Sequence, residues 1–270
     1  MRVLVTGCSS GIGRALAQEL SRRGRRVVAG ARDLSAVSDL PVEKAVQLDV
    51  TSDRSVCAAV AAAGPIDVLI NNAGLSCWGA VEAVPLRDGM RLFDTNLFGA
   101  VRMANAVLPG MRARRSGRIL QISSAAALIA PPLLGYYAAS KHALDALSQA
   151  LRMEVAAFGI EVSIFNLGAI ESKIGENRIQ GDPDLEDYKE VGEHFRTILS
   201  GGRQGAVTSH AAAVMIADTL ERPRLDLRYI YPDSTAEMLA EHRSMSERAR
   251  EEIYLNGLPK PSARTSGPVD

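Results

Sequence analysis

The chain alternates between two hydrophobic patterns. Short runs rich in β-branched and other apolar residues predict strands, and the apolar core of the run over residues 66–70 suits a parallel sheet covered on both faces. Longer stretches repeat an apolar residue every three or four positions, which predicts helices with one apolar face. The predicted strands comprise residues 2–6, 25–31, 44–48, 66–70, 118–123, 161–167 and 225–231. The predicted helices comprise residues 14–23, 52–63, 86–114, 135–158, 209–220 and 235–255, with Ser209 as the N-cap of the fifth.

The alternation of strands and helices predicts an α/β fold. Parallel strands joined by right-handed helical crossovers form a doubly wound, mostly parallel sheet, here with seven strands and helices on both faces, as in a Rossmann fold. With 270 residues, 47% of them hydrophobic, the chain is large enough for one such core. We therefore expect a single domain over residues 1–256, with ligands outside the carboxyl ends of the strands.

The hydrophobic periodicity weakens between residues 171 and 205, directly after the sixth predicted strand. This segment is rich in glycine and carries an acidic patch around Asp184. Because it follows the edge of the sheet where ligands bind, we expect it to act as a substrate lid. Residues 257–270 are rich in Pro, Ser and Gly, and we expect them to form a flexible tail.

Composition and charge argue against several classes of function. The chain carries 31 basic and 31 acidic residues, so its zero net charge does not favour a nucleic-acid or membrane-surface partner. No apolar run reaches the length of a membrane span. The three cysteines show neither paired spacing nor, with the four histidines, a metal-binding pattern. We therefore expect no metal site, and free thiols that fit a cytoplasmic location.

A glycine-rich turn follows the first predicted strand. It reads Thr6-Gly7-Cys8-Ser9-Ser10-Gly11-Ile12-Gly13, and a predicted helix begins directly after it. Glycines let the backbone approach a pyrophosphate, and the helix N-terminus offers free N–H groups and the positive end of its dipole. The spacing G-x-x-x-G-x-G differs from the usual G-x-G-x-x-G, but its place after a strand predicts a dinucleotide-binding turn. Ser9 and Ser10 are candidates to face a phosphate.

The end of the second predicted strand bears on the choice between NAD and NADP. An acidic residue there holds the adenosine ribose of NAD, whereas an arginine accommodates the 2′-phosphate of NADP. The strand ends at Ala31 and Arg32 follows, which favours NADP(H). The alternative rests on Asp33, which would reach the ribose if the alignment shifted by one residue, leaving Arg32 as a solvated loop residue.

Polar residues and glycines follow the other strands too, and parallel topology gathers them at one edge of the sheet. Asp49 and Val50 follow the third strand, where Asp49 either caps a ring amine or N-caps the next helix. Asn72-Ala73-Gly74 follows the fourth strand, where it either binds a cofactor or shapes a turn. Gly168 follows the sixth.

The helix predicted from residue 135 carries Tyr137 and Lys141, four positions apart and therefore on one face. A cation beside a phenol favours its ionised form, so the sequence predicts that Lys141 lowers the pKa of Tyr137 from about 10. Such a phenol exchanges a proton with an alcohol or a carbonyl near neutral pH. Ser124, at the end of the fifth strand, offers a hydroxyl to the same oxygen. Taken alone, a Tyr and a Lys at this spacing are also common as a surface pair.

Together these motifs resemble the short-chain dehydrogenase/reductase family, in its shorter single-domain branch. The resemblance covers residues 1 to about 170, and the interval from Ser124 to Tyr137 fits the family, which favours Ser124 over Ser123. A closer likeness, to the hydroxysteroid and retinol dehydrogenases, rests on the glycine turn, on Arg32-Asp33-Leu34 and on Leu227-Arg228-Tyr229. That group generally prefers NADP, in agreement with Arg32.

The resemblance implies a role for each catalytic candidate. Tyr137 would be the general acid/base, and Lys141 would lower its pKa and bind the nicotinamide ribose. Ser124 would position the substrate oxygen. Asn96 would hold a water in a proton relay, which gives a reason for an asparagine in the middle of a helix.

The cofactor-binding set continues past the sixth strand with one departure from the family. Relatives place Pro-Gly there and a threonine a few residues on, whereas this chain has Leu167-Gly168, then Ile170 and Ser172. The Ser172 hydroxyl is expected to replace that of the threonine at the nicotinamide amide.

The sequence thus predicts an NADP(H)-dependent oxidoreductase that interconverts a secondary alcohol and a ketone. The apolar residues 125–134 and Trp78 indicate an apolar ring substrate, unless they are ordinary core.

The alternatives are an NADP-binding sensor or structural protein without turnover, an NAD-preferring dehydrogenase, and an epimerase or dehydratase. The presence of all catalytic candidates argues against a sensor. Only about 100 residues follow Gly168, which is short for the substrate domain of an epimerase. The family implies a homodimer or homotetramer through the two long helices.

Overall fold

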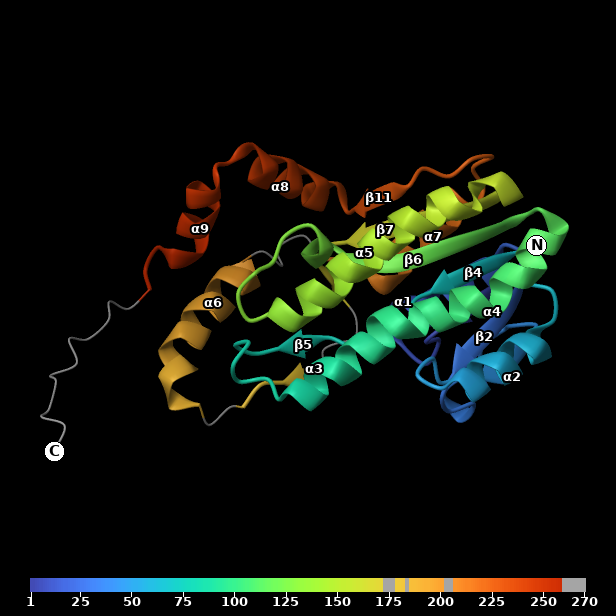
Figure 1. The fold of residues 1–270 in the computed structure, drawn as a ribbon, viewed down its shortest axis with the longest axis horizontal. Coiled ribbons are helices and arrows are strands. Elements are labelled where there is room, and N and C mark those ends of the chain that lie inside the picture. The colour runs from blue at the N-terminus through green and yellow to red at the C-terminus, as the bar shows by residue number, and fades with distance from the viewer. Residues whose placement is uncertain (172–177, 183–184, 202–205, 259–270) are drawn as a thin grey trace, which may run out of the picture.

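Seven apolar runs of the sequence form the strands of one central sheet. The computed structural model describes residues 1–171, 178–182, 185–201 and 206–258 of the chain (Figure 1). Within them, the strands of the sheet are β1 (Arg2–Thr6), β2 (Arg26–Ala31), β3 (Lys44–Gln47), β4 (Val68–Asn71), β6 (Gly117–Ser124), β7 (Ile160–Leu167) and β11 (Arg228–Tyr231). Their order is β11-β7-β6-β4-β1-β2-β3, and every neighbouring pair is parallel. The predicted α/β fold with a seven-stranded sheet is confirmed.

Helices cover both faces of the sheet because each strand alternates its side chains between two apolar faces. The covering helices are α1 (Gly11–Arg22), α2 (Asp53–Ala63), α4 (Gly99–Arg114), α5 (Gly135–Val155) and α7 (Ser209–Leu220). On one face, Val3 and Val5 of β1 belong to the core cluster that contains the buried residues of α1 and α7. On the other face, Leu4 belongs to the cluster of α2, α4 and the end of α5.

The single helix predicted for residues 86–114 consists of three consecutive segments. α3 (Leu86–Phe93) continues into a π-helical turn, η2 (Asp94–Phe98), which continues into α4. A π-helical turn closes its hydrogen bonds over five residues instead of four, and such turns are frequent at functional sites. Asn96 lies in this turn.

Two other helix predictions are wrong in detail. The closing helix predicted for residues 235–255 is two helices, α8 (Asp233–Ser244) and α9 (Glu247–Leu255). They are separate because Ser246 caps α9 by accepting a hydrogen bond from the Ala249 amide at 3.2 Å. The N-cap of α7 is Thr208, which accepts from the Ala211 amide at 3.1 Å, and not Ser209.

The segment after β7 is tied to the body by two small parallel ladders. β8 (Ile170–Glu171) pairs with β10 (Val207–Thr208), and β5 (Cys77–Trp78) pairs with β9 (Ile179–Gln180). Next to the second ladder the backbones of Gly79 and Gly181 meet so closely that a Cβ on Gly79 would lie 2.8 Å from the Gly181 Cα.

The segment of weak periodicity also contains a helix that the sequence does not predict, α6 (Lys189–Gly201). In Figure 1, α6 lies beside α9, and the His194 Nε2 lies 2.9 Å from the Tyr254 carbonyl oxygen. Residues 259–270 of the predicted tail are outside the described residues. The domain limits, the lid and the tail stay predictions. No helix in the described part of the chain is both long enough and apolar enough to cross a membrane.

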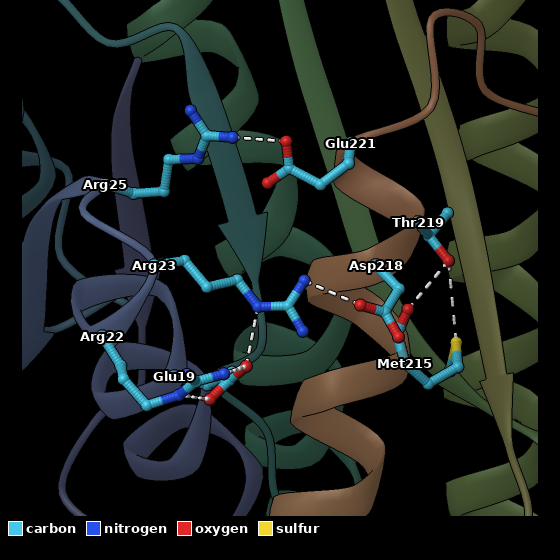
Figure 2. A network of polar contacts seen from close by, with 8 residues as sticks. All are labelled: Glu19, Arg22, Arg23, Arg25, Met215, Asp218, Thr219 and Glu221. Carbon is cyan, nitrogen blue, oxygen red and sulfur yellow. Dashed lines mark hydrogen bonds and ion pairs between the residues drawn. The ribbon is translucent and has the colours of Figure 1, made fainter.

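A network of charged side chains joins the end of α1 to the end of α7 (Figure 2). Glu19 of α1 is only 2% exposed and accepts hydrogen bonds from Arg22 and Arg23. Arg23 also forms an ion pair of 2.7 Å with Asp218 of α7. The hydrogen bond from Arg22 is the largest cause that lowers the pKa of Glu19 to about 2, against the opposing effect of burial.

Replacing Glu19 with Gln is expected to remove a pH-dependent part of the stability. A carboxylate whose folded-state pKa is depressed stabilises the fold above its ordinary value of 4.5, and this contribution disappears as the pH falls towards 2. At pH 7, Glu19→Gln should lower the free energy of unfolding by about 1–3 kcal/mol, measured by urea denaturation. Between pH 5 and pH 3 the variant should lose less stability than the wild type.

The matched control for this prediction is Glu221→Gln, which breaks the half-exposed ion pair with Arg25. Exposed ion pairs contribute about 1 kcal/mol or less, so this change should be small at any pH. Equal losses in the two variants would contradict the role assigned to Glu19.

Candidate active site

The strand order reverses between β1 and β4, and this reversal locates the candidate site. After β1 the chain builds β2 and β3 on one side, and β4 then lies on the other side of β1. In doubly wound sheets, ligands bind outside the carboxyl ends of the strands at such a point. The glycine turn follows β1, residues 72–74 follow β4, and Ser124 ends β6, so the predicted residues do gather along this edge.

The glycine turn is closely packed. Gly7 and Gly11 have φ angles of 72° and 54°, which favour glycine. A Cβ on Gly13 would lie 2.2 Å from the Gly7 carbonyl oxygen and 2.4 Å from the Asn72 side-chain nitrogen. Only glycine therefore fits where α1 starts against the end of β1. The result is a tight turn that leads into a helix N-terminus, which suits a phosphate.

Part of this turn lines a cavity of about 520 Å³. Ser9, Ser10 and Gly11 contribute to it together with Arg14, and Glu171 and Ser209 lie across from them. Ile12, also predicted to bind cofactor, is partly buried and packs against the core. The cavity and the glycine turn together fit the phosphate end of a dinucleotide.

Asn72 holds the glycine turn from behind. Its side-chain amide donates to the Thr6 carbonyl at 2.9 Å and to the Gly7 carbonyl at 3.3 Å. The Thr6 hydroxyl oxygen in turn accepts from the backbone amides of Asn72 and Ala73 at 3.0 and 2.9 Å. These residues thus shape a turn, and their binding of a cofactor stays a prediction. A Cβ on Gly74 would lie 3.2 Å from Asn96 Oδ1, so the chain also passes close to η2.

The residues after β2 are those on which the choice between NAD and NADP rests. β2 ends at Ala31, so Arg32 is the first residue beyond it, and its side chain is exposed. Asp33 Oδ1 accepts a hydrogen bond from the Ser35 amide at 2.9 Å. Hydrogen bonds from Ser35 lower the pKa of Asp33, so this carboxylate is ionised and held by its own loop.

Asp49 also shapes a turn. Its Oδ1 accepts hydrogen bonds from the Thr51 amide at 3.0 Å and from the Thr51 hydroxyl at 2.7 Å, and these bonds lower its pKa. The N-cap of α2 is Ser52 and not Asp49. Val50 is buried against α4, since a Cβ on Gly99 would lie 2.7 Å from it.

Tyr137 and Lys141 lie on one face of α5, as predicted. The Lys141 Nζ is 5.9 Å from the centroid of the Tyr137 ring, and it donates a hydrogen bond of 2.9 Å to the Ile122 carbonyl of β6. Ser124 follows two residues after Ile122, and its hydroxyl oxygen accepts from the Ala126 amide at 3.1 Å. Helix α5 and the end of β6 thus bring the phenol, the ammonium and the hydroxyl together.

The pKa shifts of Tyr137 and Lys141 correct one prediction. Burial raises the pKa of Tyr137, and a side-chain hydrogen bond with Ser124 only partly opposes this effect. Burial lowers the pKa of Lys141 to about 8, against the opposing charge of Asp145. The predicted lowering of the Tyr137 pKa by Lys141 is therefore not found, because loss of water dominates and the ammonium hydrogen-bonds the Ile122 carbonyl.

The Asn96 side chain hydrogen-bonds both the backbone of Leu75 and a side chain of α5. Its Oδ1 accepts from the Leu75 amide at 2.8 Å, while its Nδ2 donates to the Leu75 carbonyl at 3.0 Å and to Ser140 of α5 at 3.1 Å. These bonds account for a polar, 2% exposed residue in the middle of a helical stretch. The water relay that the family resemblance implies stays a prediction.

The residues after β7 fall partly outside the described chain. A Cβ on Gly168 would lie 1.9 Å from the Thr235 hydroxyl oxygen, so the start of α8 requires a glycine there. Ile170 pairs with Val207 between β8 and β10. Ser172 lies outside the described residues. Among the residues that are described, no cluster of His, Cys, Asp or Glu is placed to hold a metal ion.

A buried polar network behind Tyr137 and Lys141 is not predicted from the sequence. Asp145 of α5 accepts hydrogen bonds from Ser123 of β6, Asn166 of β7 and Arg228 of β11. The signal in the sequence is weak: Ser123 and Asn166 are polar residues near the ends of their strands, and Asp145 follows Lys141 by one helical turn.

The family model described as short chain dehydrogenase matches residues 1–182, which is more than half of the chain. The chain belongs to the short-chain dehydrogenase/reductase family. Among curated relatives, human retinol dehydrogenase 8 is 40% identical over 199 residues, or 69% of this chain and 64% of that protein. Estradiol 17-beta-dehydrogenase 1 of Rattus norvegicus is 37% identical over 95% of this chain and 80% of its own length. The match thus spans less than two thirds of retinol dehydrogenase 8.

Solved structures of the family agree in fold. The crystal structure of a short-chain dehydrogenase from Streptomyces avermitilis is 32% identical, with a TM-score of 0.81 over 93% of this chain and 94% of that one. More distant structures, 24% and 22% identical, were determined in complex with NADP and with NAD, and they show the fold alone.

Replacing Gly13 with Ala is expected to disrupt the glycine turn. The added methyl group would overlap the Gly7 carbonyl, so we expect a loss of about 1–3 kcal/mol in the free energy of unfolding and a loss of dinucleotide binding. Urea denaturation and fluorescence titration with NADPH measure the two effects.

Gly110→Ala is the control, because its Cβ would meet only the flexible end of Arg114, and alanine favours the helix. Unchanged NADPH affinity in Gly13→Ala would contradict the location of the site.

Proposed function

We propose that the protein is an NADP(H)-dependent oxidoreductase that transfers a hydride between the nicotinamide and a secondary alcohol or ketone. The observation that carries this proposal is the grouping of Tyr137, Lys141 and Ser124 at the end of β6, at the carboxyl edge of the sheet. Relatives named as dehydrogenases of retinol and of estradiol support this class of reaction.

The cofactor, when bound, supplies or accepts the hydride, and the chain handles the proton. In the reducing direction, Tyr137 donates its phenolic proton to the carbonyl oxygen of the substrate. Because burial raises its pKa, the phenol is protonated at neutral pH, which is the form that this step needs. The Lys141 ammonium, 5.9 Å from the ring, stabilises the phenolate that remains. The Ser124 hydroxyl orients the substrate oxygen.

NADP(H) is the proposed cofactor because Arg32 is the first side chain beyond β2. It is exposed, and a guanidinium there pairs with a 2′-phosphate. The competing ribose ligand, Asp33, is held by Ser35 within its own loop. Ser9 and Ser10, which line the cavity at the glycine turn, add hydroxyl groups on the phosphate side.

The substrate is proposed to be an apolar ring compound. Three leucines and one isoleucine, Leu128, Ile129, Leu133 and Leu134, are partly buried a few residues after Ser124, and Trp78 of β5 is partly buried too. Two further proposals concern the rest of the molecule: residues 171–205 close over the substrate, and the chain forms a homodimer or homotetramer. The exposed apolar side chains of Phe98, Leu147 and Met153 on η2 and α5 support such an assembly. A cytoplasmic location is proposed from the free thiols.

Removing the Tyr137 hydroxyl is expected to abolish turnover. Loss of a general acid reduces kcat by a factor of about 10² to 10⁴, so Tyr137→Phe should show almost no NADPH oxidation across a panel of apolar ketones. Its affinity for NADPH, read by fluorescence titration, should stay within about twofold of the wild type.

Tyr136→Phe, which alters the neighbouring ring, is the matched control and should retain activity. Full activity in Tyr137→Phe would refute the mechanism. Tight NADPH binding by a wild type without turnover would favour the sensor alternative.

Replacing Arg32 with Ala tests the choice of cofactor. Losing one charge-assisted hydrogen bond costs about 1.5–3 kcal/mol, so the KM for NADPH should rise by about tenfold or more. The KM for NADH should change by less than about twofold, because NADH has no 2′-phosphate. Arg54→Ala, an exposed arginine on α2, is the control. An equal rise for both dinucleotides would reverse the assignment and favour an NAD-preferring dehydrogenase.

A further inference from the structure

One face of α5 carries three functional groups in successive helical turns. Tyr137 and Lys141 are followed by Asp145, and positions four apart lie on the same face of a helix. Asp145 is only 3% exposed and Lys141 only 5%, so both charges are buried between α5 and the sheet. The proposed chemistry uses Tyr137 and Lys141, and it leaves Asp145 without a role.

Three different strands donate to the Asp145 carboxylate. The Ser123 hydroxyl of β6 donates to Oδ1 at 2.5 Å. The Asn166 amide of β7 donates to Oδ2 at 3.0 Å, and the Arg228 guanidinium of β11 donates to the same oxygen at 2.5 Å. The carboxylate therefore links the helix of the active site to every strand from β6 to the edge of the sheet.

The same network reaches Ser124. Arg228 also donates to the Asn166 side-chain oxygen, and Asn166 donates to the Ser124 carbonyl at 3.0 Å. Ser123 and Ser124 are adjacent at the end of β6, so the network holds the backbone on both sides of the serine that faces the substrate. Lys141 is bonded to the same strand at Ile122.

Stability alone does not account for this arrangement. A buried carboxylate and arginine lose their hydration, and well-packed apolar residues of similar volume are often as stable or more stable. We propose that Asp145 is a positioning residue, whose carboxylate, held by Arg228, Asn166 and Ser123, fixes the place and the charge of the Lys141 ammonium. This inference rests on the proposed function of Tyr137 and Lys141.

The groups around Lys141 determine whether a substitution raises or lowers its pKa. On α5, Tyr137 and Asp145 face the Lys141 ammonium. From β6, the Ile122 carbonyl faces it, and Asn96 of η2 lies on the other side of Gly74. The Asp145 charge raises the pKa of Lys141, which burial lowers to about 8. The Arg228 cation is bound to Asp145 and offsets that charge. Removing the anion should therefore lower the pKa of Lys141, and removing the cation should raise it.

Two variants with opposite expected effects test the proposal. In the protein saturated with NADPH, the alkaline limb of the pH profile of kcat should move down by about 0.5–1 pH unit in Asp145→Asn. It should move up, by a smaller amount, in Arg228→Gln. A network that only supports the fold would reduce activity by a similar factor at every pH, so limbs that move in the same direction, or not at all, would overturn the proposal.

The matched control is Glu161→Gln. Glu161 pairs with Arg118 at 2.8 Å across the same two strands, β6 and β7, at their opposite end. This change removes a carboxylate from the same pair of strands without approaching Lys141, so thermal stability should fall while the alkaline limb stays in place. Ser123→Ala is the milder variant if Asp145→Asn does not fold. It removes a hydroxyl donor that partly offsets the charge of the carboxylate, so it should move the limb up, as Arg228→Gln does, by a smaller amount.

A second measurement separates this proposal from the proposed function. In protein labelled with ¹³C-lysine, the Lys141 Cε signal is assigned by its absence in Lys141→Met, and its titration gives the pKa of Lys141 without any turnover. Opposite shifts of this titration in Asp145→Asn and Arg228→Gln would support the positioning role even if no ketone were reduced. A Lys141 titration that is the same in both variants would overturn it even in an active enzyme.

Discussion

The contact between the first turn of α1 and the end of β1 is the constraint on which the rest of the site depends. Gly13 lies so close to the Gly7 carbonyl that no side chain fits between them, and the Asn72 amide fills the remaining space. This packing fixes both the turn after β1, where Gly7 and Gly11 have positive φ angles, and the start of α1. The N–H groups at the start of α1 can serve an anion only because this backbone cannot relax away from the strand.

Several residues that look like ligands in the sequence also build the scaffold. Asn72, Asn96 and Asp49 each use their side chains to hydrogen-bond backbone groups in the loops at the carboxyl edge. Loops at the ends of strands leave N–H and C=O groups without ladder partners, and buried groups of this kind must be satisfied. These three polar side chains therefore hold irregular backbone in place. The groups to which we assign the chemistry, by proposal, come from α5 and the end of β6.

The strands could be predicted from the sequence because apolar residues dominate most of these runs, and burial on both faces favours this pattern. The order of elements then fixed the edge where Ser124, Tyr137 and Lys141 meet. What could not be predicted depends on local geometry or on distant contacts. The π-helical turn at Asn96 leaves the apolar pattern almost unchanged, and the break at Ser246 depends on one capping bond. The pKa of Tyr137 depends on burial. The Asp145 network joins residues that lie far apart in the sequence.

The meeting of Gly79 and Gly181 has a consequence for engineering the substrate specificity of this protein. The two loops touch through bare backbone beside the ladder of β5 and β9. A Cβ on Gly79 would lie 2.8 Å from the Gly181 Cα, and a Cβ on Gly181 would lie 3.1 Å from the Gly79 Cα. A loop taken from a relative therefore cannot be grafted on one side alone, because its new side chain would push the opposite loop away. Chimeras that exchange both loops as a unit preserve this fit, and libraries for altered selectivity are best built with these two positions left unchanged.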